Sequence, residues 1–324
     1  MNVCIVGFGA IGPVHAEALA QIEAVSIYGI CDCDREKANK GAARYGAKTF
    51  YDFSDCINDR NIDVVHICTP HYLHFEMITK ALDSGKLVVV EKPAVMKSSE
   101  LDTLMASYDV SKVFPIVQNR TNVCVQRLRE LIVSNYLGRL KGIKGILTWN
   151  RNADYYNSAA WRGTKKYEGG GVLINQAVHT LDLMIYFAGE AESISASMQN
   201  HSLTDIIEVE DTVNAYIRFR NRAVGIFYAT NAYSENSDIQ LELDFENAKA
   251  AYVYGRLYIN GEMVCSDDKS FSGKKYWGNG HLSILQNLYA NNSSFCLADI
   301  KNTMDAMFAM YESAEKGCPV ILQK

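Results

Sequence analysis

The sequence lacks both long apolar runs and blocks of like charge. Although 48% of its 324 residues are hydrophobic, no stretch approaches the length of a membrane-spanning helix, about 18 residues. The 32 basic and 37 acidic residues leave a formal net charge of −5, and neither sign is concentrated in one segment. Nucleic acids and anionic membranes select clustered lysine and arginine. We therefore expect neither of them as a partner.

The sequence also lacks the pattern of a disulfide framework or of a metal site. Its nine cysteines are odd in number, and several lie inside apolar runs such as Val3-Cys4-Ile5. This pattern predicts buried, reduced thiols. Cys31 and Cys33 have no second Cys/His pair at ligand spacing, so we predict no metal. No basic and apolar secretory segment precedes the first strand-like run, and the expected location is the cytoplasm.

The chain is longer than one hydrophobic core usually grows, so we expect two domains, 1–118 and 119–324. In the first, short apolar runs alternate with amphipathic segments of helix length, which predicts a doubly wound parallel sheet covered on both faces. The expected strands are 3–6, 26–31, 64–68, 87–90 and 113–117, and the expected helices lie near 14–21, 36–45, 75–83 and 100–107.

The pattern changes after residue 120. A helix near 123–134, a strand at 142–149, a polar and aromatic loop at 150–168 and a helix at 172–188 are expected, with closing helices at 281–291 and 299–316. Residues 191–265 read as consecutive strands, and the alternation at 215–220 and 240–245 is typical of antiparallel strands with one exposed face. Asn260-Gly261 predicts a type I′ hairpin. The second domain is therefore predicted to be α+β, with an open, mostly antiparallel sheet.

A glycine-rich motif follows the first expected strand and opens a helix. Its residues are Gly7, Phe8, Gly9, Ala10, Ile11 and Gly12. In a dinucleotide site the first glycine permits the tight turn, the second lets backbone approach the pyrophosphate, and the third allows close helix–strand packing. The helix N-terminus then favours the phosphates. The alternative is a glycine-rich turn in an α/β fold that binds no nucleotide.

Asp32 stands at the end of the second expected strand, 20 residues after Gly12. An acid there accepts hydrogen bonds from the ribose hydroxyls and repels a 2′-phosphate, which favours NAD as the cofactor. Arg35, three residues later, keeps NADP as the alternative cofactor. A simple helix N-cap is the alternative role of Asp32.

Two further segments carry reactive side chains. Lys92, in Glu91-Lys92-Pro93, ends a buried parallel strand, at the edge where such sheets bind ligands. A solvated strand-end lysine is the alternative. After three glycines, Asn175, His179 and Asp182 are spaced i, i+4 and i+7 on one helix face, which predicts a polar stripe lining a pocket. For His179 alone, a satisfied core histidine is the alternative.

Together these motifs resemble the Gfo/Idh/MocA family, the group of glucose–fructose oxidoreductase, inositol dehydrogenase and a rhizopine-catabolism protein. The matching segments run in order: GFGAIGPVH at 7–15, CTPHYLH at 68–74, EKP at 91–93, WRG at 161–163, GGGVLINQAVHTLD at 169–182, YWGNGH at 276–281 and YESA at 311–314. The resemblance implies an NAD(P)-dependent dehydrogenase for a secondary hydroxyl of a sugar, sugar derivative or cyclitol. It also implies a homodimer or homotetramer formed through the C-terminal sheet.

The resemblance assigns site residues. Lys92 matches the active-site lysine and His179 the catalytic histidine, and Asn175 is the third catalytic candidate. Many members have Asp in the place of Asn175, although a branch acting on sugar nucleotides also has Asn, and the amide favours a binding role. The cofactor set extends beyond the glycine loop and Asp32 to Thr69, Pro70, His74, Glu91 and Lys92. The expected substrate contacts are Tyr155, Trp161, Arg162, Asn175, His179 and His281, and Asn119 and Arg120 are expected to line the cleft. The Lys92–Pro93 bond is expected to be cis.

Two other functions share this pattern. Some proteins of the family oxidise a sugar transiently, eliminate an aglycone and reduce the sugar again, and thus act as NAD-dependent glycosidases or lyases. Others are sensors that bind NAD(P) without catalysis. The presence of both Lys92 and His179 is evidence against a sensor. The same residues serve a glycosidase, so the sequence leaves that alternative open.

Overall fold

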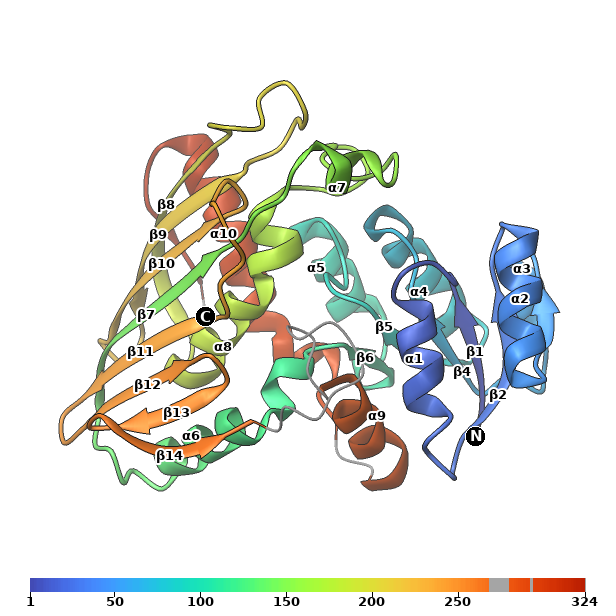
Figure 1. The fold of residues 1–324 in the computed structure, drawn as a ribbon, viewed down its shortest axis with the longest axis horizontal. Helices are drawn as coiled ribbons and strands as arrows, with labels where there is room; N and C mark the ends of the chain where they lie inside the picture. The colour runs from blue at the N-terminus through green and yellow to red at the C-terminus, as the bar shows by residue number, and fades with distance from the viewer. Residues whose placement is uncertain (268–279, 292–293, 324) are drawn as a thin grey trace. The chain divides into compact units, whose positions relative to one another are not determined.

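The computed structural model describes residues 1–267, 280–291 and 294–323, in two compact units (Figure 1). The first unit groups residues 1–118 with 279–300, and the second groups 119–278 with 301–324. The expected boundaries differ in one segment, because helix α9 (Gly280–Asn291) packs on α1 (Gly12–Leu19) of the first unit. Within the described ranges, no helix has both the length and the apolar character needed to cross a membrane.

The first unit contains a parallel sheet of six strands in the order β3-β2-β1-β4-β5-β6. The strands are β1 (Asn2–Val6), β2 (Ser26–Cys31), β3 (Lys48–Phe50), β4 (Val64–Ile67), β5 (Leu87–Val90) and β6 (Val113–Pro115). The strand order reverses between β1 and β4, where open α/β sheets bind their ligands. Almost every residue of β1, β4 and β5 is buried. The predicted doubly wound sheet is confirmed.

The helices of this unit lie close to the predicted segments. They are α1, α2 (Arg35–Tyr45), α3 (Phe53–Asn58), α4 (His74–Asp83), α5 (Ser98–Ser107) and α9, with short turns η1 (His71–Leu73), η2 (Val110–Lys112) and η5 (Leu297–Ile300). Asp34 caps α2 by accepting from the backbone N–H groups of Glu36 and Lys37. Strand β3 and helix α3 were not predicted from the sequence. Elements of three and six residues are too short to produce a periodic pattern.

The second unit contains a nine-stranded sheet in the order β14-β13-β12-β11-β7-β10-β9-β8-β15. Its strands are β7 (Leu140–Thr148), β8 (Ala191–Gln199), β9 (Thr212–Phe219), β10 (Val224–Thr230), β11 (Gln240–Phe245), β12 (Lys249–Val253), β13 (Arg256–Ile259), β14 (Glu262–Ser266) and β15 (Val320–Ile321). Neighbouring strands are antiparallel except β7 and β10. The hairpin prediction is confirmed, since Asn260 and Gly261 both have positive φ, 52° and 87°.

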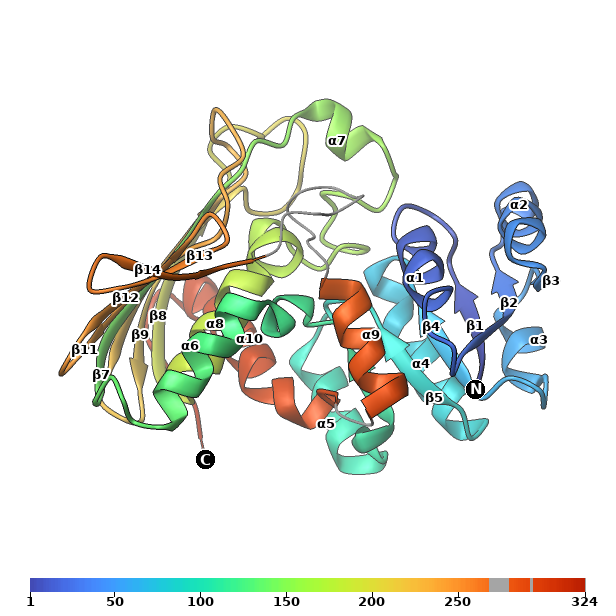
Figure 2. The ribbon, with the colours of Figure 1, turned by 60° about the horizontal axis from the view of Figure 1, so that its bottom comes forward.

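Helices α6 (Val123–Val133), α8 (Val178–Ala188) and α10 (Lys301–Lys316) lie against one face of this sheet (Figure 2). A short helix, α7 (Ala153–Asn157), lies in the expected loop, and the turn η3 (Gln118–Thr121) precedes α6. Along β9 buried and exposed residues alternate, as expected for a sheet with one covered face. On the exposed face, Tyr216, Val224 and Ile226 are 45%, 40% and 50% exposed.

Candidate active site

The glycine loop of the first unit is built for close backbone approach. Gly7 has φ +89°, and a Cβ there would lie 2.8 Å from the carbonyl oxygen of Cys68. A Cβ at Gly12 would collide with the carbonyl oxygen of Gly7. At Gly9, by contrast, a Cβ would meet nothing within 4 Å. Gly7 and Gly12 therefore serve the loop's own packing, whereas Gly9 leaves open space at the N-terminus of α1, where a pyrophosphate fits.

The different surroundings of Gly9 and Gly12 lead to a prediction. We expect Gly9→Ala to keep the unfolding temperature of the wild type but to weaken NAD binding by about tenfold or more, on the order of 1.4 kcal/mol. Gly12→Ala should lower the unfolding temperature itself, because the new methyl group meets backbone. Thermal unfolding and NAD titration of both variants separate the two effects. Full NAD affinity in Gly9→Ala would show that no phosphate approaches this glycine.

Asp32 directly follows β2 and faces the glycine loop. Its Oδ2 accepts from the N–H of Phe8 at 2.7 Å, and its Oδ1 accepts from the N–H of Asp34 at 2.8 Å. A carboxylate oxygen has a second lone pair, so both oxygens retain capacity for the ribose hydroxyls. The helix-cap alternative is excluded, since Asp34 caps α2. The guanidinium of Arg35 stacks on the ring of Tyr51, 4.3 Å from its centre.

Lys92 lies in the turn after β5, and contacts with a neighbouring loop hold this turn in place. It follows β5, it is half-buried, and the Lys92–Pro93 bond is cis, as predicted. Both ring nitrogens of His74 face carbonyl oxygens, with Nδ1 at 2.8 Å from Pro93 O and Nε2 at 2.8 Å from Thr69 O. Because a carbonyl oxygen only accepts, the neutral ring donates to one of them and the imidazolium to both. Burial lowers the pKa of His74, although both backbone contacts oppose this shift. His74 thus ties the loop after β4 to the turn that carries Lys92.

Next to Lys92, Glu91 is the centre of a buried hydrogen-bond network. His15 and His281 each place Nε2 next to Oε1 of Glu91, at 3.0 and 3.2 Å. On its other side, Nδ1 of His15 lies 2.8 Å from Nδ1 of His66, whose Nε2 lies 2.6 Å from the hydroxyl of Tyr289. Neutral imidazoles satisfy all these contacts if Tyr289 donates to His66, His66 to His15, and both His15 and His281 to Glu91.

The ionisation of this network follows from its burial. Burial lowers the pKa of His15 and that of His66, which keeps both rings neutral. Burial opposes the charge of Glu91 as well, but the hydrogen bonds from His15 and His281 outweigh it and hold the carboxyl's pKa well below its usual range. The ligand atoms of His15, Glu91 and His281 all lie within 4.8 Å of one another. Hydrogen bonding already accounts for this grouping, and the absence of a metal stays a prediction.

His281 was predicted from the sequence as a substrate contact. In the structure only 3% of it is exposed, and its ring is part of the Glu91 network. The contact with substrate therefore stays a prediction. Residues 276–279 of the same motif lie outside the described residues.

In the second unit, His179 lies half-buried near the start of α8. The helix predicted over 172–188 is confirmed, but it begins with a π-helical turn, η4 (Leu173–Ala177). The glycines before it are required by packing: a Cβ at Gly170 would collide with the hydroxyl of Tyr311, and one at Gly171 with the carbonyl oxygen of Glu210. Single π-turns within α-helices are frequent at functional sites.

Glu210 anchors this helix start. Its carboxylate accepts from the N–H groups of Gly171 and Leu173, at 2.9 and 3.1 Å, and from the hydroxyl of Tyr311 at 2.8 Å. Burial raises the pKa of Glu210 in spite of these hydrogen bonds. Donors from two elements therefore fix the entry of the chain into η4, the turn that carries Asn175.

The predicted polar stripe is divided in the structure. Asn175 donates through Nδ2 to Glu168, which also accepts from the N–H of Gly163. Asp182 instead forms a buried, two-pronged ion pair with Arg120, at 2.7 and 2.9 Å, and accepts from Thr303. The side chains of Asp182 and Arg120 are 3% and 4% exposed and pair with each other, so a place for Asp182 in a pocket and for Arg120 along the cleft stays a prediction. Asn119, expected with Arg120, is also buried. The π-turn changes the spacing on which the stripe was predicted.

Three of the predicted substrate contacts gather with Asn175. The guanidinium of Arg162 lies 4.3 Å from the ring centre of Tyr155 and 4.9 Å from that of Trp161, and it donates to the Tyr155 hydroxyl. Gln176 donates to the same hydroxyl at 3.0 Å. Asn175 also donates to this hydroxyl, through Nδ2, in a longer contact of 3.5 Å. We call Tyr155, Trp161, Arg162, Asn175 and Gln176 the Tyr155 cluster. Burial raises the pKa of Tyr155.

Sequence reasoning missed two members of this arrangement. Glu168, only 1% exposed, holds Asn175, and Gln176 bonds Tyr155. The signal for Glu168 in the sequence was its position directly before three glycines. In the structure this carboxylate is buried and not exposed to solvent. No signal distinguished Gln176 from its neighbours.

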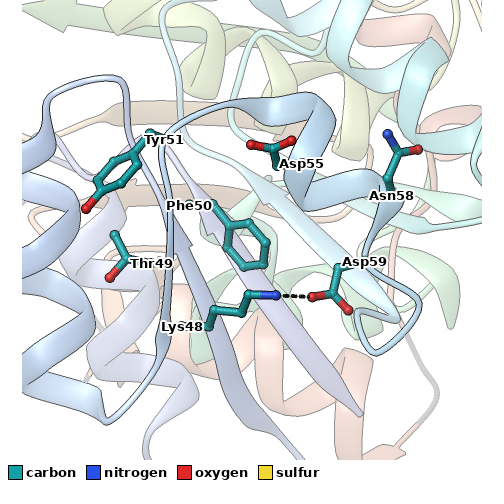
Figure 3. Close-up of a pocket in the computed structure, with 7 residues that line it drawn as sticks. All are labelled: Lys48, Thr49, Phe50, Tyr51, Asp55, Asn58 and Asp59. Carbon is teal, nitrogen blue, oxygen red and sulfur yellow. Dashed lines mark hydrogen bonds and ion pairs between the residues drawn. The ribbon is translucent and has the colours of Figure 1, made fainter.

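The first unit also has a surface hollow of about 430 Å³ beside β3 and α3 (Figure 3). Its lining residues are Lys48, Thr49, Phe50, Tyr51, Asp55, Asn58 and Asp59. Lys48 donates to Asp59 at 2.7 Å, and this hydrogen bond is the main cause that lowers the pKa of Asp59 to about 2. No residue predicted for the site lines this hollow, and we assign it no role.

A parallel sheet with this glycine loop and an acid after β2 defines an NAD-binding oxidoreductase. Residues 1–117 match the family model described as an oxidoreductase family with an NAD-binding Rossmann fold, and residues 125–251 match the GFO/IDH/MocA C-terminal domain. The chain therefore belongs to the Gfo/Idh/MocA family of oxidoreductases. The resemblance stated from its motifs is confirmed, and so is NAD as the cofactor.

Several known proteins are similar to this chain. Levoglucosan dehydrogenase of Pseudarthrobacter phenanthrenivorans is 28% identical over 292 residues, 79% of this chain and 74% of the relative. Myo-inositol 2-dehydrogenase of Thermotoga maritima is 24% identical over 291 residues, 85% and 81% of the two chains. The solved WlbA dehydrogenase of Bordetella pertussis, in complex with NADH and UDP-GlcNAcA, has a TM-score of 0.86 and 25% identity, covering 100% of this chain and 99% of the other.

Proposed function

We propose that this enzyme transfers hydride between NAD and a secondary hydroxyl of a sugar, sugar derivative or cyclitol. The observation that carries the proposal is the Tyr155 cluster, in which aromatic rings, a guanidinium and amides gather around Asn175, which is four residues before His179 in the sequence. Such groups suit a polyhydroxylated ring, whose C–H faces stack on aromatics while its hydroxyls need donors and acceptors. The relatives that act on levoglucosan and myo-inositol support the same substrate class.

NAD, when bound, supplies the hydride acceptor, and Gly7, Gly9, Gly12 and Asp32 are the residues proposed to hold it. Phe8, Ala10, Ile11, Thr69, Pro70 and Glu91 complete the proposed cofactor site, and His74 supports it. Neutral His179 accepts the proton of the substrate hydroxyl, since an alcohol that loses hydride must also lose its proton. Protonated Lys92 donates to the same oxygen and stabilises its developing negative charge.

The remaining contacts are assigned to binding. Trp161 and Tyr155 offer ring faces to the substrate, and Arg162 suits a carboxylate or phosphate on it. By the resemblance of its motif, Asn175 is a neutral amide in the place where many members of the family have a carboxylate. Because Asn175 already donates to Glu168, we assign it to orienting substrate through its carbonyl oxygen.

The proposal includes assembly and location. Tyr216, Val224 and Ile226 lie on the uncovered face of the nine-stranded sheet, and apolar side chains there favour a homodimer or homotetramer formed through that face. All nine cysteines are free thiols, which favours the reducing cytoplasm.

A substrate screen tests the proposed function. Cyclitols, aldoses, sugar acids and nucleotide sugars are incubated with the enzyme and either NAD or NADP, and the absorbance of the reduced nicotinamide is followed. We expect NADH to appear in step with the loss of one substrate class. Titration should show NAD binding at least about tenfold tighter than NADP, because Asp32 repels a 2′-phosphate.

Other results of the screen and the titration would each indicate a different function or cofactor. Substrate that disappears without release of NADH indicates the glycosidase or lyase alternative. NAD binding with no turnover of any class would indicate a sensor. Tighter binding of NADP would overturn the role of Asp32 and assign the phosphate to Arg35.

A further inference from the structure

Two cysteines far apart in the sequence meet in the second unit. Cys124 is the second residue of α6, and Cys265 lies on β14, the edge strand of the nine-stranded sheet. The thiol of Cys265 donates to Sγ of Cys124, and the two sulfurs are 2.9 Å apart. That separation is within about 1 Å of a covalent S–S bond. The two sulfurs are therefore close enough for a bond to form between them after a small movement of the side chains.

The backbone around both cysteines is held in place. Asp267, two residues after Cys265, accepts from the N–H of Cys124 at 2.9 Å and from the hydroxyl of Tyr252 at 2.7 Å. The Tyr252 hydroxyl in turn accepts from Asn122 at 3.3 Å. The start of α6 and the end of β14 are therefore joined by hydrogen bonds on both sides of the sulfur pair. This fixed geometry gives the two sulfurs a high effective concentration toward each other.

The two thiols differ in access. Cys124 is fully buried, while Cys265 is half-buried on a strand whose other residues are mostly exposed. Burial raises the pKa of Cys124, and the adjacent thiol and Asp267 add to this effect. An external oxidant therefore reaches Cys265 first, and the buried Cys124 then reacts with Cys265.

We propose that Cys124 and Cys265 are a redox-responsive pair that a hydroperoxide converts into a disulfide. The Cys265 thiolate attacks one peroxide oxygen, the O–O bond breaks, and hydroxide leaves to give a sulfenic acid. The Cys124 sulfur then attacks the sulfenic sulfur, the S–O bond breaks, and water leaves with the proton of the Cys124 thiol. In sum, two thiols and one hydrogen peroxide give one disulfide and two waters, and two electrons pass to the peroxide.

The disulfide would join residues 141 positions apart and tie the edge strand to helix α6. Closing so long a loop restricts the unfolded chain. Oxidation should therefore raise the unfolding temperature of the wild type, and a dithiol reductant should reverse the change.

Peptide mapping tests the proposal directly. The full-length protein is treated with one equivalent of hydrogen peroxide under native conditions, alkylated while unfolding, and digested with trypsin without reductant. We expect a linked pair of peptides, 121–127 with 257–269, which dithiothreitol separates. Cys124→Ser and Cys265→Ser should each lack this pair, and Cys318→Ser, which removes an exposed thiol, should retain it.

Two results would overturn the proposal. One is alkylation of both peptides in the wild type after a treatment that has oxidised the exposed Cys33 or Cys318. The other is linkage of Cys124 or Cys265 to different cysteines. Because the linked peptides are detected in the wild-type protein, the proposal does not depend on the folding of any variant.

Discussion

Replacing Lys92 by alanine is expected to lower turnover by ~100-fold or more, with NAD affinity within a few-fold of the wild type. Lys92 is proposed to act on the substrate oxygen, where charge develops during the reaction, so its loss affects the reaction more than binding. The fold should persist, because the ring nitrogens of His74 contact the carbonyl oxygens of Pro93 and Thr69 and hold the turn that carries Lys92. Steady-state kinetics and NAD titration measure the two effects.

His179→Ala is expected to have a loss of the same size, ~10²-fold or more, because the hydroxyl proton then has no positioned acceptor. Two matched substitutions serve as controls. Lys97→Ala removes an exposed lysine in the segment that follows Lys92. His201→Ala removes an exposed histidine of the second unit. Both should retain wild-type turnover. A fully active Lys92→Ala or His179→Ala enzyme would remove that residue from the proposed mechanism.

Asp182→Ala is expected to destabilise the protein strongly, by about 3–5 kcal/mol. The substitution leaves Arg120, whose side chain is 4% exposed, as a buried cation without its carboxylate, and it also removes the acceptor of Thr303. The guanidinium of Arg120 also lies 4.7 Å from the centre of the Tyr186 ring, a contact that cannot replace the charge of the carboxylate. Denaturant unfolding followed by circular dichroism measures the loss.

An exposed ion pair in the same unit provides the control. Arg139 and Glu246 are 3.0 Å apart, with side chains 54% and 46% exposed. Water solvates either partner when the other is removed, so Glu246→Ala should leave stability nearly unchanged. Equal effects of the two substitutions would contradict the structural role assigned to Asp182. A fully stable Asp182→Ala protein with low activity would return that residue to the active site.

The sequence by itself determined the features that local patterns encode. Short apolar runs that alternate with amphipathic segments identify a parallel sheet, because strands buried on both faces must be apolar throughout. The glycine motif and Asp32 predict where the dinucleotide binds, since a tight turn and close helix–strand packing require those residue types at that spacing. Asn260-Gly261 identified its hairpin for the same reason, as both residues tolerate positive φ.

The tertiary structure alone decided which polar side chains meet. Spacing on an ideal helix put Asn175, His179 and Asp182 on one face, but a π-turn lies in this helix, and Asn175 and Asp182 have different buried partners, Glu168 and Arg120. Those partners lie 7 and 62 positions away in the sequence. The meeting of Cys124 and Cys265 across 141 positions has the same origin. Periodicity reports only which face of an element is buried, whereas the identity of a buried partner depends on how distant elements pack.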